Sequence, residues 1–182
     1  MPPPAHPGNL RAVAERRAIG YNAAVNGAGS LAVELPDLAA TARLAARLAD
    51  LARTGDAIGL AGELGVGKTT FARAFINHLA GETVEVPSPT FNLVLSYPTP
   101  GVTIWHFDLY RVERAEELAE LGFDDALAEG IALVEWPERL GAAWPADGLI
   151  LGFESAAGEA HRVRIQGGGD WPKRLKSMAA HV

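Results

Sequence analysis

The stretch Gly62-Glu63-Leu64-Gly65-Val66-Gly67-Lys68-Thr69 matches the pattern G-x-x-x-x-G-K-[ST] at every constrained position. Upstream lies the short apolar run Ala57-Ile58-Gly59-Leu60-Ala61, which is typical of a buried parallel strand. Downstream, Phe71, Phe75 and Leu79 recur at helical spacing. A strand, a glycine-rich loop and a helix in this order are the context that a phosphate-binding P-loop requires. The chain is therefore expected to bind a nucleoside triphosphate.

The residue types in this loop suit the charge of a bound triphosphate. Glycines let the main chain wrap a phosphate with its N–H groups pointing inward, where a Cβ atom would obstruct the approach. Lys68 adds a positive charge for the outer phosphates, and Thr69 offers a hydroxyl to a Mg²⁺ that already carries phosphate oxygens. The following helix brings the positive end of its dipole to the same place. The flanking strand and helix argue against a glycine-rich turn that ends in Lys-Thr by chance.

Composition narrows the class of protein. The chain has 182 residues, of which 48% are hydrophobic, so one domain with a substantial core is expected. The formal charge of −6 and the pI of about 5.3 argue against a large basic surface for direct capture of nucleic acid. The chain has no cysteine, which suits a reducing compartment, and no apolar stretch approaches the roughly 18 to 20 residues that span a bilayer. The expectation is a cytoplasmic protein without membrane contact.

Two regions of the chain differ in pattern. Residues 1–30 begin with Met-Pro-Pro-Pro and contain three arginines among Ala, Asn and Gly, which predicts a flexible N-terminal extension with at most a short helix between residues 10 and 18. An arginine-bearing start also occurs in transit peptides, but Glu15 and the proline cluster fit that interpretation poorly. Residues 31–182 are expected to form a single P-loop domain.

Apolar strands and amphipathic helices alternate through this domain. The first helix should open at Pro36-Asp37 and place Leu38, Leu44, Leu48 and Leu51 on one broad face. The pairs 91–97 with 102–107 and 149–153 with 161–166 are expected to form antiparallel hairpins. Together these features predict an α/β fold, a P-loop NTPase-like three-layer sandwich whose sheet is parallel at its centre and has added antiparallel strands. The strands are expected at 31–35, 57–61, 91–97, 102–107, 131–134, 149–153 and 161–166, and the helices at 36–54, 70–79, 115–121, 124–128 and 172–180.

A P-loop also needs a carboxylate at the end of a neighbouring strand, to hold the magnesium shell or to orient the attacking water. Asp108 follows the apolar run 104–107, and Glu135 follows the run 131–134. Either acid could simply end a strand at the surface, but two of them beside a P-loop favour at least one functional carboxylate. Spacing alone does not decide which of the two contacts the metal.

Three other positions allow two interpretations each. Ser88-Pro89-Thr90 is either an ordinary proline turn or a loop whose hydroxyl senses the γ-phosphate. His106 lies among aromatic residues of a strand and is expected to pack in the core rather than to act as a base. Trp136, just before Pro137, is either a wall of the site or a cap on the sheet edge.

Sequence motifs of other P-loop classes are missing downstream of Lys68. The chain lacks the Asn-Lys-x-Asp motif that reads guanine and the Asp-x-x-Gly motif of a GTPase switch, so ATP is expected rather than GTP. A small-molecule kinase usually has a mobile lid rich in arginine. Between residues 109 and 138 the only cations are Arg111 and Arg114, which are few for such a lid.

Taken together, these segments resemble the TsaE family, also called YjeE, of P-loop ATPases in bacterial tRNA threonylcarbamoyladenosine biosynthesis. The resemblance extends from about Leu31 to Gln166. It departs from the family in the long N-terminal extension and at Asn92, where Thr is common. The segments resemble, in order, the family's Walker A motif, switch-type loop, Walker B region and two further blocks, at 62–71, 87–94, 106–111, 116–123 and 133–138.

The resemblance implies a role for each site residue. Lys68 would bind phosphate, Thr69 and Glu135 would coordinate Mg²⁺, and Asp108 would assist hydrolysis. Thr90 would sense the phosphate, so the catalytic candidates are Lys68, Asp108 and Thr90. The candidates for ATP binding belong to the P-loop and to a segment beside the adenine, and they are Leu38, Glu63, Leu64, Gly65, Val66, Gly67, Lys68, Thr69 and Thr70.

The resemblance also implies a function. Proteins of this family act on the partners TsaB and TsaD, which modify adenosine 37 of tRNAs that read codons beginning with A, and they meet tRNA only through that complex. ATP binding and hydrolysis would drive a cycle of docking and release. The residues alone leave two alternatives open: a small-molecule P-loop kinase, and a scaffold that binds ATP and barely hydrolyses it.

Overall fold

The computed structural model describes residues 30–113, 117, 120–156 and 160–179. The expected N-terminal extension, apart from its last residue, lies outside these residues. Most of the helix expected at 115–121 lies outside them as well.

The described residues form a seven-stranded sheet. Its strands are β1 (Leu31–Leu35), β2 (Ala57–Ala61), β3 (Val94–Pro98), β4 (Thr103–Asp108), β5 (Gly130–Glu135), β6 (Leu149–Ser155) and β7 (His161–Gly167), in the spatial order β1-β7-β6-β2-β5-β4-β3. The central strand β2 is parallel to β5 and β6, and β5 is parallel to β4. The pairs β1–β7, β6–β7 and β3–β4 are antiparallel. The predicted parallel centre with two added hairpins is confirmed.

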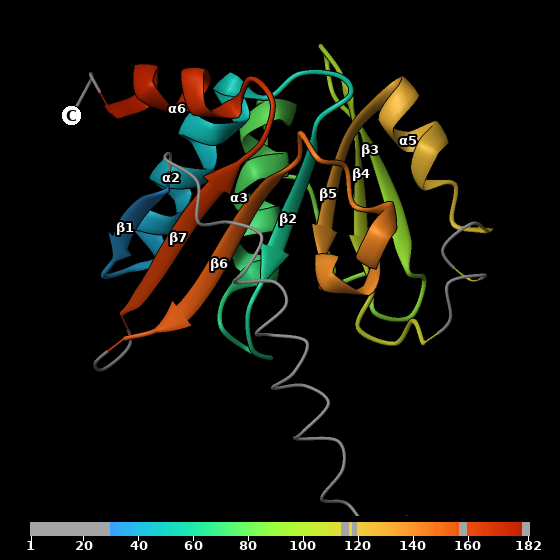
Figure 1. Ribbon diagram of the computed structural model, residues 1–182, viewed down its shortest axis with the longest axis horizontal. Coiled ribbons are helices and arrows are strands. Elements are labelled where there is room, and N and C mark those ends of the chain that lie inside the picture. Colours follow the sequence, from blue (N-terminus) through green and yellow to red (C-terminus); the bar gives the residue numbers. More distant parts are fainter. Residues whose placement is uncertain (1–29, 114–116, 118–119, 157–159, 180–182) are drawn as a thin grey trace, which may run out of the picture.

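Helices cover both faces of the sheet. They are α2 (Leu38–Leu51), α3 (Lys68–Ala80), α5 (Phe123–Glu129) and α6 (Trp171–Ala179), with 3-10 turns η1 (Pro137–Arg139) and η2 (Gly141–Ala143). The larger hydrophobic cluster joins α2, α3 and α6 to one face, and the smaller joins α5 to the other. Figure 1 shows α2, α3 and α6 grouped together, with α5 at the opposite end of the sheet. The predicted three-layer sandwich is therefore confirmed. None of the described helices is long and apolar enough to cross a membrane.

The helix α2 begins and packs largely as its sequence predicts. The carboxylate of Asp37 accepts the N–H of Ala40 at 2.7 Å and so caps the helix. Leu44 and Leu48 are buried in the core. The prediction that Leu38 shares their face was wrong, because Leu38 is 74% exposed. At about 100° per residue, Leu38 lies roughly 80° around the helix from Leu48.

The strand β3 begins later than its apolar sequence predicts. Residues 91–93 form a turn in which Leu93 has a φ angle of 64° and donates its N–H to the carbonyl of Pro89 at 2.6 Å. Phe91 projects from this turn and is 83% exposed. The prediction of a strand from residue 91 was therefore wrong for its first three residues. The other described strands and α-helices agree with the prediction to within a few residues, and the turns η1 and η2 were not predicted.

Gly59 allows the turn η1 to pack closely on β2. A Cβ atom at Gly59 would lie 2.5 Å from Cδ1 of Ile150 and 2.8 Å from Cβ of Pro137. Gly59→Ala is therefore expected to lower the free energy of unfolding by about 1–3 kcal/mol, the usual cost of overpacking a core. Urea denaturation measures this change. Gly101→Ala is the control, since nothing lies within 4 Å of a Cβ atom there. Small and equal changes in the free energy of unfolding of both variants would contradict this packing.

Candidate functional site

The P-loop lies between the carboxyl end of β2 and the start of α3. Gly65 and Gly67 have φ angles of 80° and 103°, a left-handed backbone that favours glycine. Gly67 is also the N-cap of α3 and makes no side-chain cap. The loop and the first turn of α3 therefore leave N–H groups free at the positive end of a helix dipole. This arrangement suits an anion such as phosphate.

Asp108 and Glu135 end neighbouring strands on the same side of the sheet. In the register of β4 and β5, Asp108 lies directly opposite Glu135. Side chains alternate along a strand, so both acids share the face that carries Ile131 and Leu133, which is the face covered by α3. Asp108 is only 4% exposed and Glu135 only 3%. The fold therefore places both acids beside the P-loop.

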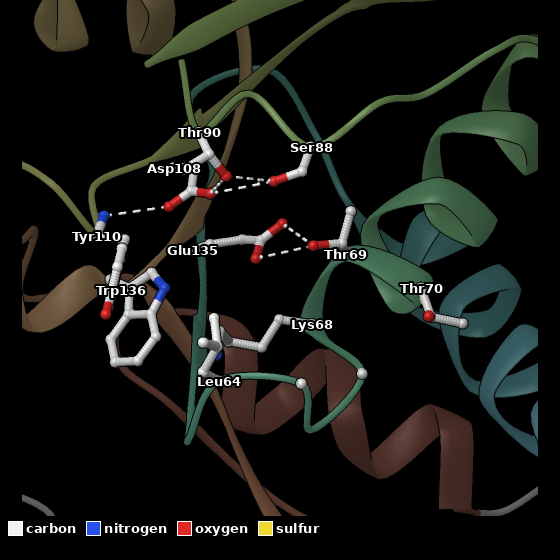
Figure 2. A pocket seen from close by; sticks show the side chains of 12 residues that line it. Leu64, Lys68, Thr69, Thr70, Ser88, Thr90, Asp108, Tyr110, Glu135 and Trp136 are labelled. Atoms are coloured by element: carbon white, nitrogen blue, oxygen red, sulfur yellow. Dashed lines mark hydrogen bonds between the residues drawn. The ribbon is translucent and has the colours of Figure 1, made fainter. Parts of the chain in front are cut away.

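Glu135 makes hydrogen bonds with two other side chains. The hydroxyl of Thr69 lies 2.8 Å from Oε1 and 3.1 Å from Oε2 of Glu135, as Figure 2 shows. Nε2 of His106 lies 3.0 Å from Oε1. The first turn of α3 is thus joined directly to the end of β5.

The pair formed by Thr69 and Glu135 fits a magnesium ion. Both side chains offer oxygen atoms, which Mg²⁺ prefers as ligands. Mg²⁺ is usually held by few protein groups and completes its shell with phosphate oxygens and water. The pair therefore suits a metal ion that arrives with a nucleotide.

Asp108 is bound to the loop that precedes β3. Thr90 donates its hydroxyl to Oδ2 of Asp108 at 2.7 Å, and Ser88 donates to the same oxygen at 3.2 Å (Figure 2). The hydroxyls of Ser88 and Thr90 lie 2.7 Å apart. The other oxygen, Oδ1, accepts the backbone N–H of Tyr110 at 3.0 Å. The 88–90 loop is therefore joined to the end of β4 by two side-chain hydrogen bonds, and its response to a γ-phosphate stays a prediction.

Lys68 is folded back into the P-loop. Its ammonium group donates to the carbonyl oxygens of Gly62 and Glu63, each at 2.7 Å, and lies 4.1 Å from the centre of the Trp136 ring. Lys68 is only 4% exposed, and this burial lowers its pKa, although the nearby negative charges, Glu135 foremost, oppose the shift. Trp136 is therefore a wall of the site rather than a cap on the sheet edge.

These side chains surround a cavity of about 380 Å³, shown in Figure 2. The carboxylates and hydroxyls come from α3, β4, β5 and the 88–90 loop, and the glycines from the P-loop. The lining residues are Leu64, Gly65, Gly67, Lys68, Thr69, Thr70, Ser88, Thr90, Asp108, Tyr110, Glu135 and Trp136.

The sequence profile of one protein family, described as Threonylcarbamoyl adenosine biosynthesis protein TsaE, matches residues 35–163. The chain belongs to the TsaE family. The match includes the P-loop, the 88–90 loop and both strand-end acids, so every residue that lines the cavity lies within the part of the chain shared with the TsaE family.

Individual relatives agree with this membership. A Rickettsia felis protein named tRNA threonylcarbamoyladenosine biosynthesis protein TsaE is 47% identical over 98 residues, which cover 54% of this chain and 57% of that protein. The match thus spans little more than half of that relative. A protein of the same name from Aquifex aeolicus is 38% identical over 69% of this chain and 87% of its own. The crystal structure of YdiB from Bacillus subtilis superimposes with a TM-score of 0.71 at 25% identity, covering 84% of this chain and 95% of that one.

Most residues that the resemblance to the TsaE family assigned to ATP or metal line this one cavity. Three of the assigned residues, Leu38, Glu63 and Val66, are not among its lining residues. Glu63 contributes the carbonyl that Lys68 contacts, and the side chain of Val66 is buried in the core, which leaves only its backbone for a ligand. Leu38 is exposed at the first residue of α2 and is not among the lining residues. Its predicted place beside the adenine stays a prediction.

The sequence did not predict the contacts that two residues make in this TsaE-family site. His106 is completely buried, as expected of a packing residue, but it also contacts the carboxylate of Glu135. Tyr110 lines the cavity and lies 5.0 Å from the ring of Trp136, centre to centre. The signals for Tyr110 were its position two residues after Asp108 and its place in the segment 106–111, which resembles the family's Walker B region.

Proposed function

We propose that this TsaE-family protein is a Mg²⁺-dependent ATPase that supports formation of the threonylcarbamoyl group on adenosine 37 of tRNAs reading codons that begin with A. It would act in the cytoplasm on a complex of TsaB and TsaD and reach tRNA only through that complex. The observation that carries the ATPase proposal is the contact of Thr69 with Glu135 at the P-loop. The names of its relatives from Rickettsia felis and Aquifex aeolicus support the pathway.

ATP binding would move Lys68 from its present partners. The ammonium group now donates to two carbonyl oxygens, which carry only partial negative charge. Phosphate oxygens carry full charge and form stronger hydrogen bonds with an ammonium group. The same phosphates would raise the lowered pKa of Lys68, so binding would stabilise its charged form.

Thr69 and Glu135 would hold the magnesium ion that accompanies ATP. A bound Mg²⁺ would neutralise charge on the phosphates and on the leaving group. Thr69 can turn an oxygen lone pair to the metal while its hydrogen stays on Glu135, so the contact with Glu135 would orient the hydroxyl for this role.

Asp108 would assist the attacking water, and Thr90 would respond to the γ-phosphate. Asp108 now accepts the hydroxyls of Thr90 and Ser88 on one oxygen. If Thr90 donates to the γ-phosphate instead, Oδ2 of Asp108 regains a lone pair that a water molecule can use. Binding of ATP would thus prepare the carboxylate for hydrolysis.

The change of hydrogen-bond partner at Thr90 would also move a side chain at the protein surface. Phe91 follows Thr90 directly, is 83% exposed and lies 4.5 Å beneath the guanidinium of Arg111. A shift of Thr90 between Asp108 and a phosphate would move this exposed ring. Mg-ATP would favour the partner-bound arrangement of the loop, and hydrolysis would release it.

The first test is Mg-ATP hydrolysis by the purified protein, alone, with TsaB alone, and with TsaB and TsaD together. Stimulation by the complete pair is expected, because the loop that senses the γ-phosphate also carries the exposed ring. If TsaB and TsaD leave the rate of ATP hydrolysis unchanged, the proposal that this protein acts on them is wrong. Phosphate transfer to an added small molecule without any partner would indicate a kinase, and tight ATP binding with negligible turnover in every mixture would indicate a scaffold.

A further inference from the structure

We infer that His106 is a positioning residue that orients the carboxylate of Glu135 for the metal ion. This inference rests on the proposed function, since it concerns the same Mg-ATP site. His106 lies on β4, paired with Leu95 of β3 on one side and Leu133 of β5 on the other. Its side chain is completely buried and comes from the face of the sheet that α3 covers.

The contact with Glu135 has a defined direction. Nε2 of His106 lies 3.0 Å from Oε1 of Glu135. We assign the hydrogen to Nε2, because a carboxylate that is to bind Mg²⁺ has no hydrogen to donate. Oε1 then receives two donors, from His106 and from Thr69 at 2.8 Å, whereas Oε2 receives only the longer bond from Thr69 at 3.1 Å. The oxygen with more unused accepting capacity is therefore Oε2.

Packing alone does not explain a histidine at this position. Nδ1 of His106 is buried without a hydrogen-bond partner in the described part of the chain. A buried polar atom without a partner destabilises a protein, and an apolar side chain of similar volume would avoid this cost. The Nε2 contact with Glu135 is the polar interaction that a histidine adds here.

His106 and Thr69 hold Glu135 in different ways. Thr69 belongs to the P-loop helix, and its oxygen would also face the metal ion while its hydrogen stays on Glu135. His106 lies in the interior of the sheet between two strands, and its other ring nitrogen has no hydrogen-bond partner among the residues that the structure describes. It therefore keeps one oxygen of Glu135 fixed while the other is presented to the ion, as groups behind metal ligands commonly do.

The test measures binding of a fluorescent ATP analogue at increasing MgCl₂ in the full-length protein. His106→Leu is expected to raise the half-saturating Mg²⁺ concentration by about 10-fold or more, the usual effect of losing a group behind a metal ligand. Analogue binding in EDTA should stay within about 2-fold of wild type, because Lys68 and the glycine loop are untouched. His106→Gln should recover most of the Mg²⁺ affinity, since its amide nitrogen can occupy the place of Nε2 and donate.

His106→Asn is the matched control for the glutamine variant, because its shorter side chain places the amide nitrogen nearer to Nδ1. If His106→Leu fails to fold by circular dichroism, the comparison of Gln with Asn decides instead, and equal Mg²⁺ affinity in both would overturn the inference. Unchanged Mg²⁺ dependence in a folded His106→Leu, or an equal loss of binding in EDTA, would also overturn it. Wild-type binding that ignores Mg²⁺ would overturn the proposed function itself.

Discussion

Replacing Lys68 or Glu135 by alanine is expected to lower the ATP turnover number by at least about 100-fold, which is typical when one group that stabilises a transferring phosphoryl group is lost. The physical reasons differ. Lys68→Ala removes the buried charge that would leave the carbonyls of Gly62 and Glu63 for the phosphates. Glu135→Ala removes the carboxylate that contacts Thr69. Steady-state phosphate release with and without TsaB and TsaD measures both effects.

Measurements of nucleotide binding distinguish the Lys68→Ala variant from the Glu135→Ala variant. Lys68→Ala should weaken binding of ATP even in EDTA, because its charge acts on the phosphates directly. Glu135→Ala should leave binding in EDTA nearly unchanged and lose the gain that Mg²⁺ provides. Lys176→Ala is the charge-matched control, since Lys176 is exposed on α6. Near-normal turnover in either site variant would break the assignment of this cavity as an ATPase site.

The P-loop residues that line the cavity could be predicted because the P-loop is a local motif. Its spacing fixes Gly67, Lys68 and Thr69 within one short stretch of backbone, so no knowledge of the tertiary structure is needed. An apolar run followed by an acid is equally local, and it pointed to both Asp108 and Glu135. The parallel centre of the sheet followed from the alternation of strands and helices.

The contacts among these residues could not be predicted, because they depend on strand order and on turns. Asp108 meets Glu135 only because β4 and β5 are neighbours in register, although the segment with α5 lies between them in sequence. His106 reaches Glu135 through the same register. At Leu93, a left-handed backbone and a bond to the Pro89 carbonyl override the strand preference of an apolar run.

Asp108→Asn is expected to lower the ATP turnover number by about 100-fold while ATP affinity stays within about 3-fold of wild type. Asparagine keeps the size of the side chain but loses the charge and one of the two accepting oxygens. Asp108 uses both oxygens, Oδ2 for Thr90 and Ser88 and Oδ1 for the N–H of Tyr110. In the variant the amide oxygen can accept the N–H of Tyr110, and the amide nitrogen can only donate to the hydroxyls of Thr90 and Ser88. No oxygen then remains at the place of Oδ2 to accept a hydrogen from the attacking water. Single-turnover hydrolysis with pre-bound Mg-ATP measures the chemical step separately from binding.

The control for this change is Asp124→Asn, an identical substitution at an exposed position of α5. It should leave the rate of hydrolysis at the wild-type value, because its carboxylate lies on the helix across the sheet from the P-loop. A normal single-turnover rate in Asp108→Asn would assign Asp108 to holding the loop alone. Glu135 would then have to serve both the metal and the water, and stimulation by the partners, rather than basal hydrolysis, would be the property that depends on Asp108 and Thr90.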